Sequence, residues 1–260
     1  MGLLDNLTDR QDTGSIFIDS DSILWSAIWK FKDDWNIEFA YMEFIERIGR
    51  IRTEAYNQVI KLEDLIIGFT SATNFRYEVY KDYKATRKDN LTEEQQLTNL
   101  RVKELKKLVY KRLKGICKIS SILEADDMAI YYANYHNYMV AAIDKDVINA
   151  SPTKCFNYSK FKWLEPNSKD DIERWYLIQS IMGDTSDNIP GIRGMGKVKA
   201  ENFVDNLLAG DKTFNDYIDL FDTNEHCLMT NRLVRMNQVD KDMKLKLCSI
   251  EDVIYGITGF

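Results

Sequence analysis

The chain has few residues of the kinds that build zinc sites or disulfide frameworks. Its 260 residues include four cysteines and two histidines, and no two cysteines form a CxxC pair. A zinc site or a disulfide framework is therefore not expected, and the sequence favours a reducing, cytoplasmic compartment. With so little cysteine and histidine, catalytic chemistry has to come from carboxylates, hydroxyls or lysines.

Long apolar runs and disorder-promoting segments are also missing. The longest apolar runs, such as residues 65–69, have the length of a strand, so we expect no membrane span. Residues 1–15 are polar and mixed in charge, without a signal-peptide core. Three prolines, twelve glycines and 45% hydrophobic residues indicate a globular chain with a sizeable core and no long flexible linker.

The net charge of −6 is unevenly distributed along the chain. Residues 81–118 contain twelve Lys or Arg and five Asp or Glu, which gives a local charge of +7 and leaves −13 for the rest. Such a stretch attracts anions, although a solvated helix face with uneven ion pairs would have the same composition.

The hydrophobic pattern alternates between buried strands and amphipathic helices. Strands are expected at 15–18, 65–69, 116–119 and 138–143, and helices at 37–59, 92–114 and 124–135. This alternation predicts an α/β fold with a mostly parallel central sheet and helices on both faces. From Asp170 onward the chain looks wholly helical, apart from a Gly-rich turn at 191–196. We therefore expect an α/β body over 1–160 and a helical part over 161–260.

Acidic residues gather where a sheet of this kind places its ligand crevice. They form four short clusters: Asp19; Glu124, Asp126 and Asp127; Asp144 and Asp146; and Asp184 and Asp187. Asp19 and the Asp144–Asp146 pair follow predicted strands, and ligands of open α/β sheets bind outside the carboxyl ends of the strands. The acids at 184 and 187 are three residues apart, which on a helical turn places them on one face.

Eight carboxylates in one crevice repel each other unless cations neutralise them. Oxygen ligands without His or Cys favour hard divalent ions, Mg²⁺ or Mn²⁺, and two such ions are a common device for phosphodiester cleavage. Two of the clusters also have a structural interpretation of their own, residues 124–127 as a helix cap and 144–146 as a turn, and the pair at 184 and 187 taken alone is as compatible with a structural role as with a metal site. The occurrence of all four together favours the metal site.

Six segments occur in an order that resembles a known family. They are Phe17-Ile18-Asp19, Asn74-Phe75-Arg76-Tyr77, Tyr83-Lys84-Ala85-Thr86-Arg87, Glu124-Ala125-Asp126-Asp127, Asp144-Lys145-Asp146 and GDTSDNIPG at 183–191. Together they resemble the 5′-3′ exonuclease and flap endonuclease family over roughly residues 15–240. The stand-alone bacteriophage members and the 5′-nuclease domain of bacterial DNA polymerase I are the most similar groups. The resemblance implies a PIN-like or resolvase-like body with a helical arch.

The resemblance assigns roles to these residues. It implies a first metal group of Asp19, Glu124, Asp126 and Asp127, and a second of Asp144, Asp146, Asp184 and Asp187. Tyr83, Lys84 and Arg87 match a YKxxR motif at the base of the arch. There Lys84 would stabilise charge on the scissile phosphate, and Tyr83 would stack on an unpaired terminal base.

The basic stretch at about 81–118 would be the arch beside which a 5′ single strand passes. Its cations would contact phosphates without reading sequence. The Gly-rich turn resembles the family's helix-hairpin-helix variant at about 184–205, whose glycines let backbone N–H groups approach a duplex phosphate and whose carbonyls often bind K⁺. The implied DNA-binding residues are Arg76, Lys88, Arg101, Lys103, Lys106, Lys107, Gly191, Gly194, Gly196, Lys197 and Lys199.

One position departs from the family pattern. An acid that joins the first metal group usually follows the second strand, and this chain has Thr70-Ser71-Ala72-Thr73 there. Asp64 does not replace it, because it lies at the amino end of that strand. We therefore expect the first site to bind metal less tightly or to need more Mg²⁺.

The resemblance implies a Mg²⁺-dependent, structure-specific 5′ nuclease with two metal ions, for which Mn²⁺ can substitute. Its substrates would be DNA with 5′ ends or flaps, and RNA primers paired to DNA. It would act in phage DNA replication, in the host cytoplasm, as a monomer that meets other replication proteins. Two alternatives stay open: a PIN-like ribonuclease, and a non-catalytic DNA-junction binder with a degraded first metal site.

Overall fold

A computed structural model describes residues 11–87 and 91–258. Within these ranges the chain divides into two compact units. Unit 1 comprises residues 11–72 and 91–166, and unit 2 comprises residues 73–87 and 167–258. The body expected over residues 1–160 is therefore interrupted, because the segment 73–87 packs with the C-terminal helices. No helix in the described ranges is both long and apolar enough to cross a membrane.

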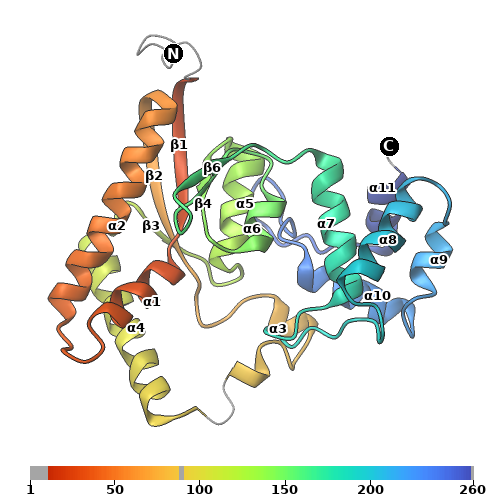
Figure 1. The fold of residues 1–260 in the computed structure, drawn as a ribbon, viewed down its shortest axis with the longest axis horizontal. Coiled ribbons are helices and arrows are strands. Elements are labelled where there is room, and N and C mark those ends of the chain that lie inside the picture. Colours follow the sequence, from red (N-terminus) through yellow and green to blue (C-terminus); the bar gives the residue numbers. More distant parts are fainter. Residues whose placement is uncertain (1–10, 88–90, 259–260) are drawn as a thin grey trace. The chain divides into compact units, whose positions relative to one another are not determined.

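Unit 1 is built on a six-stranded sheet in the order β3-β2-β1-β4-β5-β6 (Figure 1). The strands are β1 (Gln11–Asp19), β2 (Val59–Phe69), β3 (Cys117–Ile119), β4 (Met139–Ala141), β5 (Cys155–Asn157) and β6 (Lys162–Leu164). Strands β1 to β5 pair in parallel, and β6 runs antiparallel to β5. The predicted mostly parallel sheet is confirmed. Asp19 pairs in register with Gly68, so β1 and β2 end at the same edge.

Helices cover both faces of this sheet, as predicted. The helices α1 (Asp21–Lys30), α2 (Ile37–Gln58) and α4 (Glu93–Arg112) share one apolar core, and α5 (Ala125–His136) packs on β1, β2 and β4 (Figure 1). A short helix, α6 (Lys145–Ala150), follows β4. Side chains of β1 alternate between the two layers: Ile16 and Ile18 enter the core with α1 and α2, and Phe17 stacks on Tyr132 of α5 at 5.2 Å between ring centroids.

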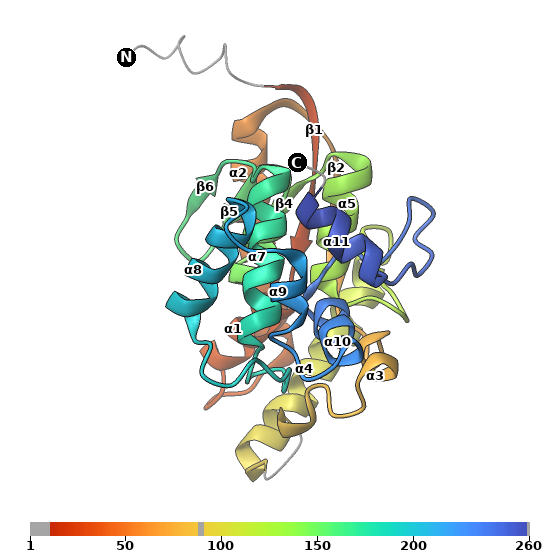
Figure 2. The same cartoon turned by 90° about the vertical axis from the view of Figure 1, so that its right-hand side faces the viewer.

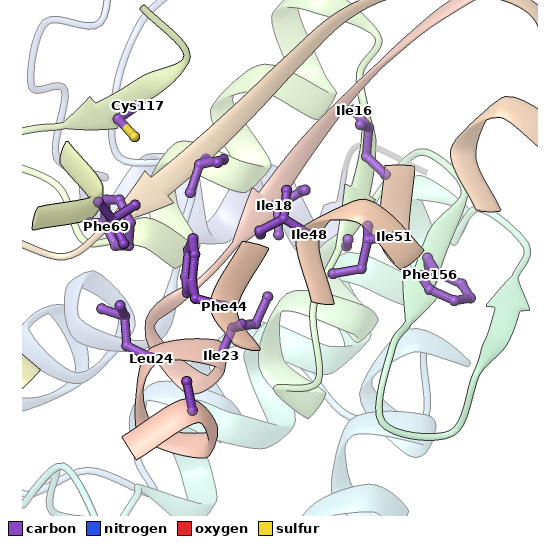
Figure 3. Close-up of a cluster of buried hydrophobic side chains, with 14 of the residues drawn as sticks. Ile16, Ile18, Ile23, Leu24, Phe44, Ile48, Ile51, Phe69, Cys117 and Phe156 are labelled. Atoms are coloured by element: carbon purple, nitrogen blue, oxygen red, sulfur yellow. The ribbon is translucent and has the colours of Figure 1, made fainter. Parts of the chain in front are cut away.

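The main core of unit 1 fills the space between β1, β2 and the helices α1 and α2 (Figure 3). Phe44 of α2 stacks on Phe69 of β2, and both rings are fully buried. Burying a side chain of this size contributes about 1.5–3 kcal/mol. Gly68 is required at its place in β2, because a Cβ there would lie 2.2 Å from the Phe17 ring. The end of β2, where the site begins, is therefore held by packing on both faces.

Local signals set the starts of the two long helices of unit 1. The side chain of Asn36 accepts hydrogen bonds from the backbone N–H groups of Glu38 and Phe39 and caps α2. Thr92 and Gln95 form a capping box at the start of α4. Both helices agree with the predicted ranges to within two residues.

Unit 2 contains the remaining helices. They are α3 (Arg76–Val79), α7 (Lys169–Met182), α8 (Lys197–Leu208), α9 (Phe214–Ile218), α10 (Asn224–Val234) and α11 (Ile250–Thr258). The helices α8 and α10 both pack against α7, around a core that includes Leu177, Ile181 and Tyr217 (Figure 2). A buried ion pair joins Arg235 and Glu173 through two hydrogen bonds.

Unit 2 differs from the wholly helical segment that the sequence predicts. Antiparallel bridges join Asp184 to Ile189 and Val239 to Leu245, and residues 235–249 contain no helix. The segment 73–87 joins this unit through Tyr83, which is buried against Ile189 and Leu233. These contacts are long-range, and hydrophobic period along the chain does not report them.

Candidate metal and DNA sites

Asp19 is the last residue of β1 and lies at the carboxyl edge of the sheet. Its side chain is 6% exposed, and its Oδ1 atom is buried without a hydrogen-bond partner. Burial, followed by the negative charges of Asp21, Asp144 and Glu124, raises the pKa of Asp19 to about 8. Three of the predicted metal ligands in unit 1 therefore lie close enough to interact. A buried carboxylate with an unpartnered oxygen and like charges around it is what a divalent cation would stabilise.

The acids at residues 124–127 form the first turn of α5. The Oδ2 atom of Asp127 accepts a hydrogen bond from the Glu124 backbone N–H at 3.0 Å, as part of a capping box. Both side chains are buried, and Asp126 is partly exposed. The helix cap that the sequence allows is thus present, and it uses a carboxylate oxygen of Asp127. Glu124 is the member of this cluster whose charge acts on Asp19.

Asp144 and Asp146 lie after β4 at the start of α6. Asp144 is the N-cap residue, and its Oδ1 atom accepts a hydrogen bond from the Asp146 N–H at 2.8 Å. The spacing that we interpreted as two carboxylates pointing to one side is therefore also a capping turn. Asp144 is exposed and its charge acts on Asp19. Among the described residues, no three Asp, Glu, His or Cys side chains form a closed group that could hold a metal ion.

In unit 2, Asp184 and Asp187 lie in a tight loop and not on the helical turn that we expected. The backbone groups of Asp184 and Ile189 exchange two hydrogen bonds, at 3.0 and 2.7 Å. The Oδ1 atom of Asp184 accepts a bond from the Ser186 N–H at 2.7 Å. Gly191 is required beside this loop, because a Cβ there would lie 1.9 Å from the Met182 carbonyl oxygen.

Asp187 contacts all three residues that match the YKxxR motif. The Tyr83 hydroxyl donates to Oδ2 at 3.0 Å, the Lys84 ammonium lies 3.5 Å from Oδ2, and the Arg87 guanidinium donates to Oδ1. The Lys84 backbone N–H also donates to the Asp187 carbonyl at 2.8 Å. Lys84 has a left-handed backbone with φ of 55°, an unusual conformation for a residue other than glycine. The loop at 183–191 thus fixes the position of Lys84.

Two residues of unit 2 that were predicted to contact DNA, Tyr83 and Arg76, have buried side chains. Tyr83 is 2% exposed and packs edge-to-face on Tyr77, so it is not placed to stack on a terminal base. Arg76 is 3% exposed, and its Nε atom donates to the Leu233 carbonyl at 2.7 Å. Arg76 therefore joins the segment after β2 to the end of α10, and its guanidinium is used inside unit 2 rather than on the surface. A buried arginine needs such acceptors.

The predicted basic residues of α4 fall into two groups. Arg101 donates to the Lys32 carbonyl at 2.9 Å, and Lys106 forms an ion pair with Asp21 at 2.9 Å. Lys103 and Lys107 are exposed, as a phosphate contact requires. Lys88 lies outside the described residues. The sequence predicts the positive charge of α4 but not which of its cations are already used within unit 1.

The Gly-rich turn between α7 and α8 is open at its tip. Gly194 has φ of +80°, and a Cβ on Gly194 or Gly196 would meet nothing within 4 Å. Gly196 is the N-cap of α8, so the unpaired N–H groups of that helix begin here. The Lys199 ammonium donates to the Gly194 carbonyl at 3.1 Å, and Lys197 lies 3.8 Å from Glu201. One carbonyl of the predicted K⁺ site is therefore already bonded to a lysine.

Asp21 is the residue that sequence reasoning missed. It exerts the largest electrostatic effect on Asp19 and contacts both the end of β2 and α4. The signal was present in the sequence, because Asp19-Ser20-Asp21 has the same Asp-x-Asp spacing as residues 144–146. The notable feature of the first cluster is thus a pair of acids where a single one was expected.

Comparisons with known proteins identify relatives of this chain. No protein-family model matches it. It is 26% identical over 176 residues to the flap endonuclease of Escherichia phage T5, an alignment that covers 61% of this chain and 58% of the phage protein. It is 30% identical over 165 residues to DNA polymerase I of Borreliella burgdorferi, which covers 55% of this chain and 17% of the polymerase. The matched part thus spans less than two thirds of either relative.

Solved structures share the fold. The T5 D15 protein crystallised with metal ions superposes with a TM-score of 0.67 at 19% identity, over 86% of this chain and 90% of that one. The D15 flap endonuclease in a complex with DNA and metal ions gives 0.67 at 18% identity, over 95% and 98%. The catalytic core of Rad2 with a DNA substrate gives 0.52 at 15% identity, over 98% and 89%. The chain is therefore a homologue of the T5 flap endonuclease and of the 5′-nuclease region of DNA polymerase I, and it has the fold of the T5 enzyme.

Proposed function

We propose that this chain is a Mg²⁺-dependent, structure-specific 5′ nuclease that hydrolyses DNA at 5′ ends or 5′ flaps. The observation that carries the proposal is the buried carboxylate of Asp19 at the carboxyl edge of the sheet, which has one oxygen without a hydrogen-bond partner and lies near Glu124 and Asp144. The homology to a phage flap endonuclease supports the substrate class. RNA primers paired to DNA, action in phage DNA replication with other replication proteins, and a monomeric state belong to the same proposal.

The donor set fits hard divalent ions. All the candidate ligands are carboxylates, which Mg²⁺ and Mn²⁺ prefer, and burial leaves Asp19 with an oxygen that no protein group uses. We propose that Asp19, Glu124, Asp126 and Asp127 hold a first ion and that Asp144 and Asp146 contribute to a second. Asp184 and Asp187 enter as ligands of the second ion on the strength of their sequence motif. When bound, the ions supply Lewis-acid stabilisation of the charge that develops during phosphodiester hydrolysis.

The chain's own residues would bind and orient the substrate. Lys84, held by its backbone bond to Asp187, presents an ammonium that would stabilise the scissile phosphate. The exposed Lys103 and Lys107 of α4 would contact backbone phosphates of the 5′ strand. The exposed N-terminus of α8, with Gly194, Gly196 and Lys197, would approach a duplex phosphate. K⁺ would bind at this turn only by displacing Lys199 from the Gly194 carbonyl.

A cleavage assay on a fluorescent 5′-flap duplex tests the proposal. The wild-type chain is assayed in Mg²⁺, in Mn²⁺ and in EDTA, and Asp184→Ala is assayed in Mg²⁺. We expect cleavage near the junction that requires both the divalent ion and Asp184. Tight flap binding without cleavage, even in Mn²⁺, would contradict a nuclease. That result would favour the junction binder, for which the lack of an acid among residues 70–73, directly after β2, is the specific observation.

A further inference from the structure

Asp21 is hydrogen-bonded to the residue that follows β2, the strand after which the expected acid is missing. Its Oδ2 atom accepts a hydrogen bond from the Thr70 backbone N–H at 2.9 Å. Thr70 directly follows β2, whose end lies beside the end of β1 at Asp19. The carboxylate of Asp21 therefore lies beside the backbone of the residue that directly follows β2. It reaches this place from the first turn of α1, two residues after Asp19.

Lys106 neutralises this carboxylate from α4. Its ammonium lies 2.9 Å from Asp21 Oδ1 and donates to the Thr70 carbonyl at 2.8 Å. Both side chains are mostly buried, with exposed fractions of 22% for Lys106 and 28% for Asp21. An ion pair at this depth is stronger than a pair in open solvent. Asp21 is thus held on Thr70 by one backbone donor and one cation.

Thr70 also links the Asp21–Lys106 pair to the acids at the start of α5. The Thr70 hydroxyl accepts a hydrogen bond from the Ala125 backbone N–H at 3.0 Å. Ala125 follows Glu124, and both Glu124 and Asp21 act electrostatically on Asp19. Asp19 in turn has a buried oxygen without a partner. Asp19 with its unpartnered oxygen, Asp21 beside Thr70, and Glu124 at the start of α5 therefore gather at one edge of the sheet.

We propose that Asp21 is a further ligand of the first divalent ion, and that it supplies the carboxylate that β2 lacks. Lys106 is its counter-ion in the absence of metal, and the ion takes the place of the ammonium when it binds. This inference rests on the metal dependence proposed above.

Replacing Asp21 and replacing Lys106 are expected to change the metal affinity in opposite directions. Asp21→Asn removes a ligand charge, and loss of a group that supports a metal site typically weakens binding about 10–100-fold. Lys106→Met removes a cation that competes for the same carboxylate, so binding of a divalent ion tightens. A lysine that only stabilised the fold would give weaker metal binding, or no change, when replaced.

Binding of Mn²⁺ to the full chain without DNA tests the proposal, with free Mn²⁺ followed by electron paramagnetic resonance. The variants are Asp21→Asn and Lys106→Met, and the matched controls are the exposed Asp34→Asn and Lys111→Met. Thermal unfolding in EDTA establishes that each variant folds. The proposal requires weaker binding by Asp21→Asn, tighter binding by Lys106→Met, and wild-type affinity in both controls.

Three results would overturn the proposal, and each is distinguishable from the others. If the wild type binds Mn²⁺ and Asp21→Asn binds it equally well, Asp21 is not a ligand, and the proposed nuclease function is unaffected. If the wild type binds no Mn²⁺, the metal dependence itself is wrong and this inference falls with it. If Asp21→Asn does not fold, Lys106→Met decides alone, and unchanged or weaker binding by that variant overturns the proposal.

Discussion

The Tyr83 hydroxyl donates a hydrogen bond to the Asp187 carboxylate over 3.0 Å. Residues 83 and 187 are far apart in the sequence, yet this bond and the backbone bond from Lys84 to Asp187 join the two motifs into one element of unit 2. Asp187 therefore orients Lys84 and Arg87, whatever else it binds. A buried tyrosine whose hydroxyl holds an acid has a positioning role and not a stacking role.

Tyr83→Phe tests this positioning role. Loss of the hydroxyl removes one hydrogen bond to a charged acceptor, and we expect the free energy of unfolding to fall by about 1–3 kcal/mol. Tyr83→Ala also empties part of the core shared with Ile189 and Leu233, at a cost of about 3–5 kcal/mol. Urea unfolding measures both values. Equal stability of the wild type and Tyr83→Phe would show that the bond to Asp187 contributes nothing.

The raised pKa of Asp19 predicts a pH-dependent stability in the absence of metal. Its pKa rises from 3.8 to about 8 on folding, so the folded state holds this proton more tightly than the unfolded state. Stability therefore falls as the pH rises between these two values, by about 1.4 kcal/mol per pH unit at most. Below pH 3.8 the group is protonated in both states and has no effect.

Asp19→Asn removes this titration. We expect the variant to be more stable than the wild type at pH 8 in EDTA and similar to it at pH 4, because asparagine carries no charge to bury. Thermal unfolding from pH 4 to pH 8 measures the difference, and added Mg²⁺ should stabilise the wild type more than the variant. A constant difference between the two proteins across this range would contradict the assignment.

Variants of Arg76 and Lys103 compare a cation that supports the fold with one that is proposed to bind DNA. Arg76→Ala leaves the Leu233 carbonyl without its donor and opens a buried space, so we expect a loss of at least about 1–3 kcal/mol of stability. Lys103→Ala should leave stability unchanged and weaken flap binding. The dependence of log Kd on log salt concentration should decrease by about 0.9 for each lost phosphate contact. Flap binding that is insensitive to Lys103 would remove α4 from the DNA surface.

Alanine substitutions at Gly191 and Gly194 test how closely the backbone packs at the turn between α7 and α8. A methyl group on Gly191 collides with the Met182 backbone, whereas Gly194 has open space and only a left-handed φ. Gly194→Ala should therefore cost about 1–2 kcal/mol, and Gly191→Ala should cost more. Thermal unfolding ranks the two variants. The reverse order would contradict the close approach of the backbone at Gly191.

Sequence patterns predict the sheet well because its core is strongly periodic. Ile16 and Ile18 on one face and Phe17 on the other produce a run that only a strand buried on both faces explains. The strands β5 and β6 are not predicted because neither lies in an apolar run such as the one at 138–143, which contains the equally short β4. The helix α1 also escapes, since the predicted pattern begins at Ile37.

The candidate site is predictable as a set of residue types and less so as a set of contacts. The acids at 19, 124 and 144 interact as their places after strands suggest. The burial of Arg76 and the pairing of Lys106 with Asp21 depend on segments distant in sequence, which a local charge pattern does not report. A basic residue read from sequence is therefore a candidate for DNA contact only until its partners are known.

Cleavage of a 5′-flap duplex by the wild type and by Asp19→Asn tests the central claim most directly. Both proteins are assayed in Mg²⁺ under single-turnover conditions, after their flap affinities have been shown to be equal in Ca²⁺. We predict Mg²⁺-dependent cleavage by the wild type and a loss of at least about a hundredfold in rate for the variant, because a lost metal ligand removes transition-state stabilisation. Cleavage by Asp19→Asn at the wild-type rate would show that the buried carboxylate at the end of β1 does not serve catalysis.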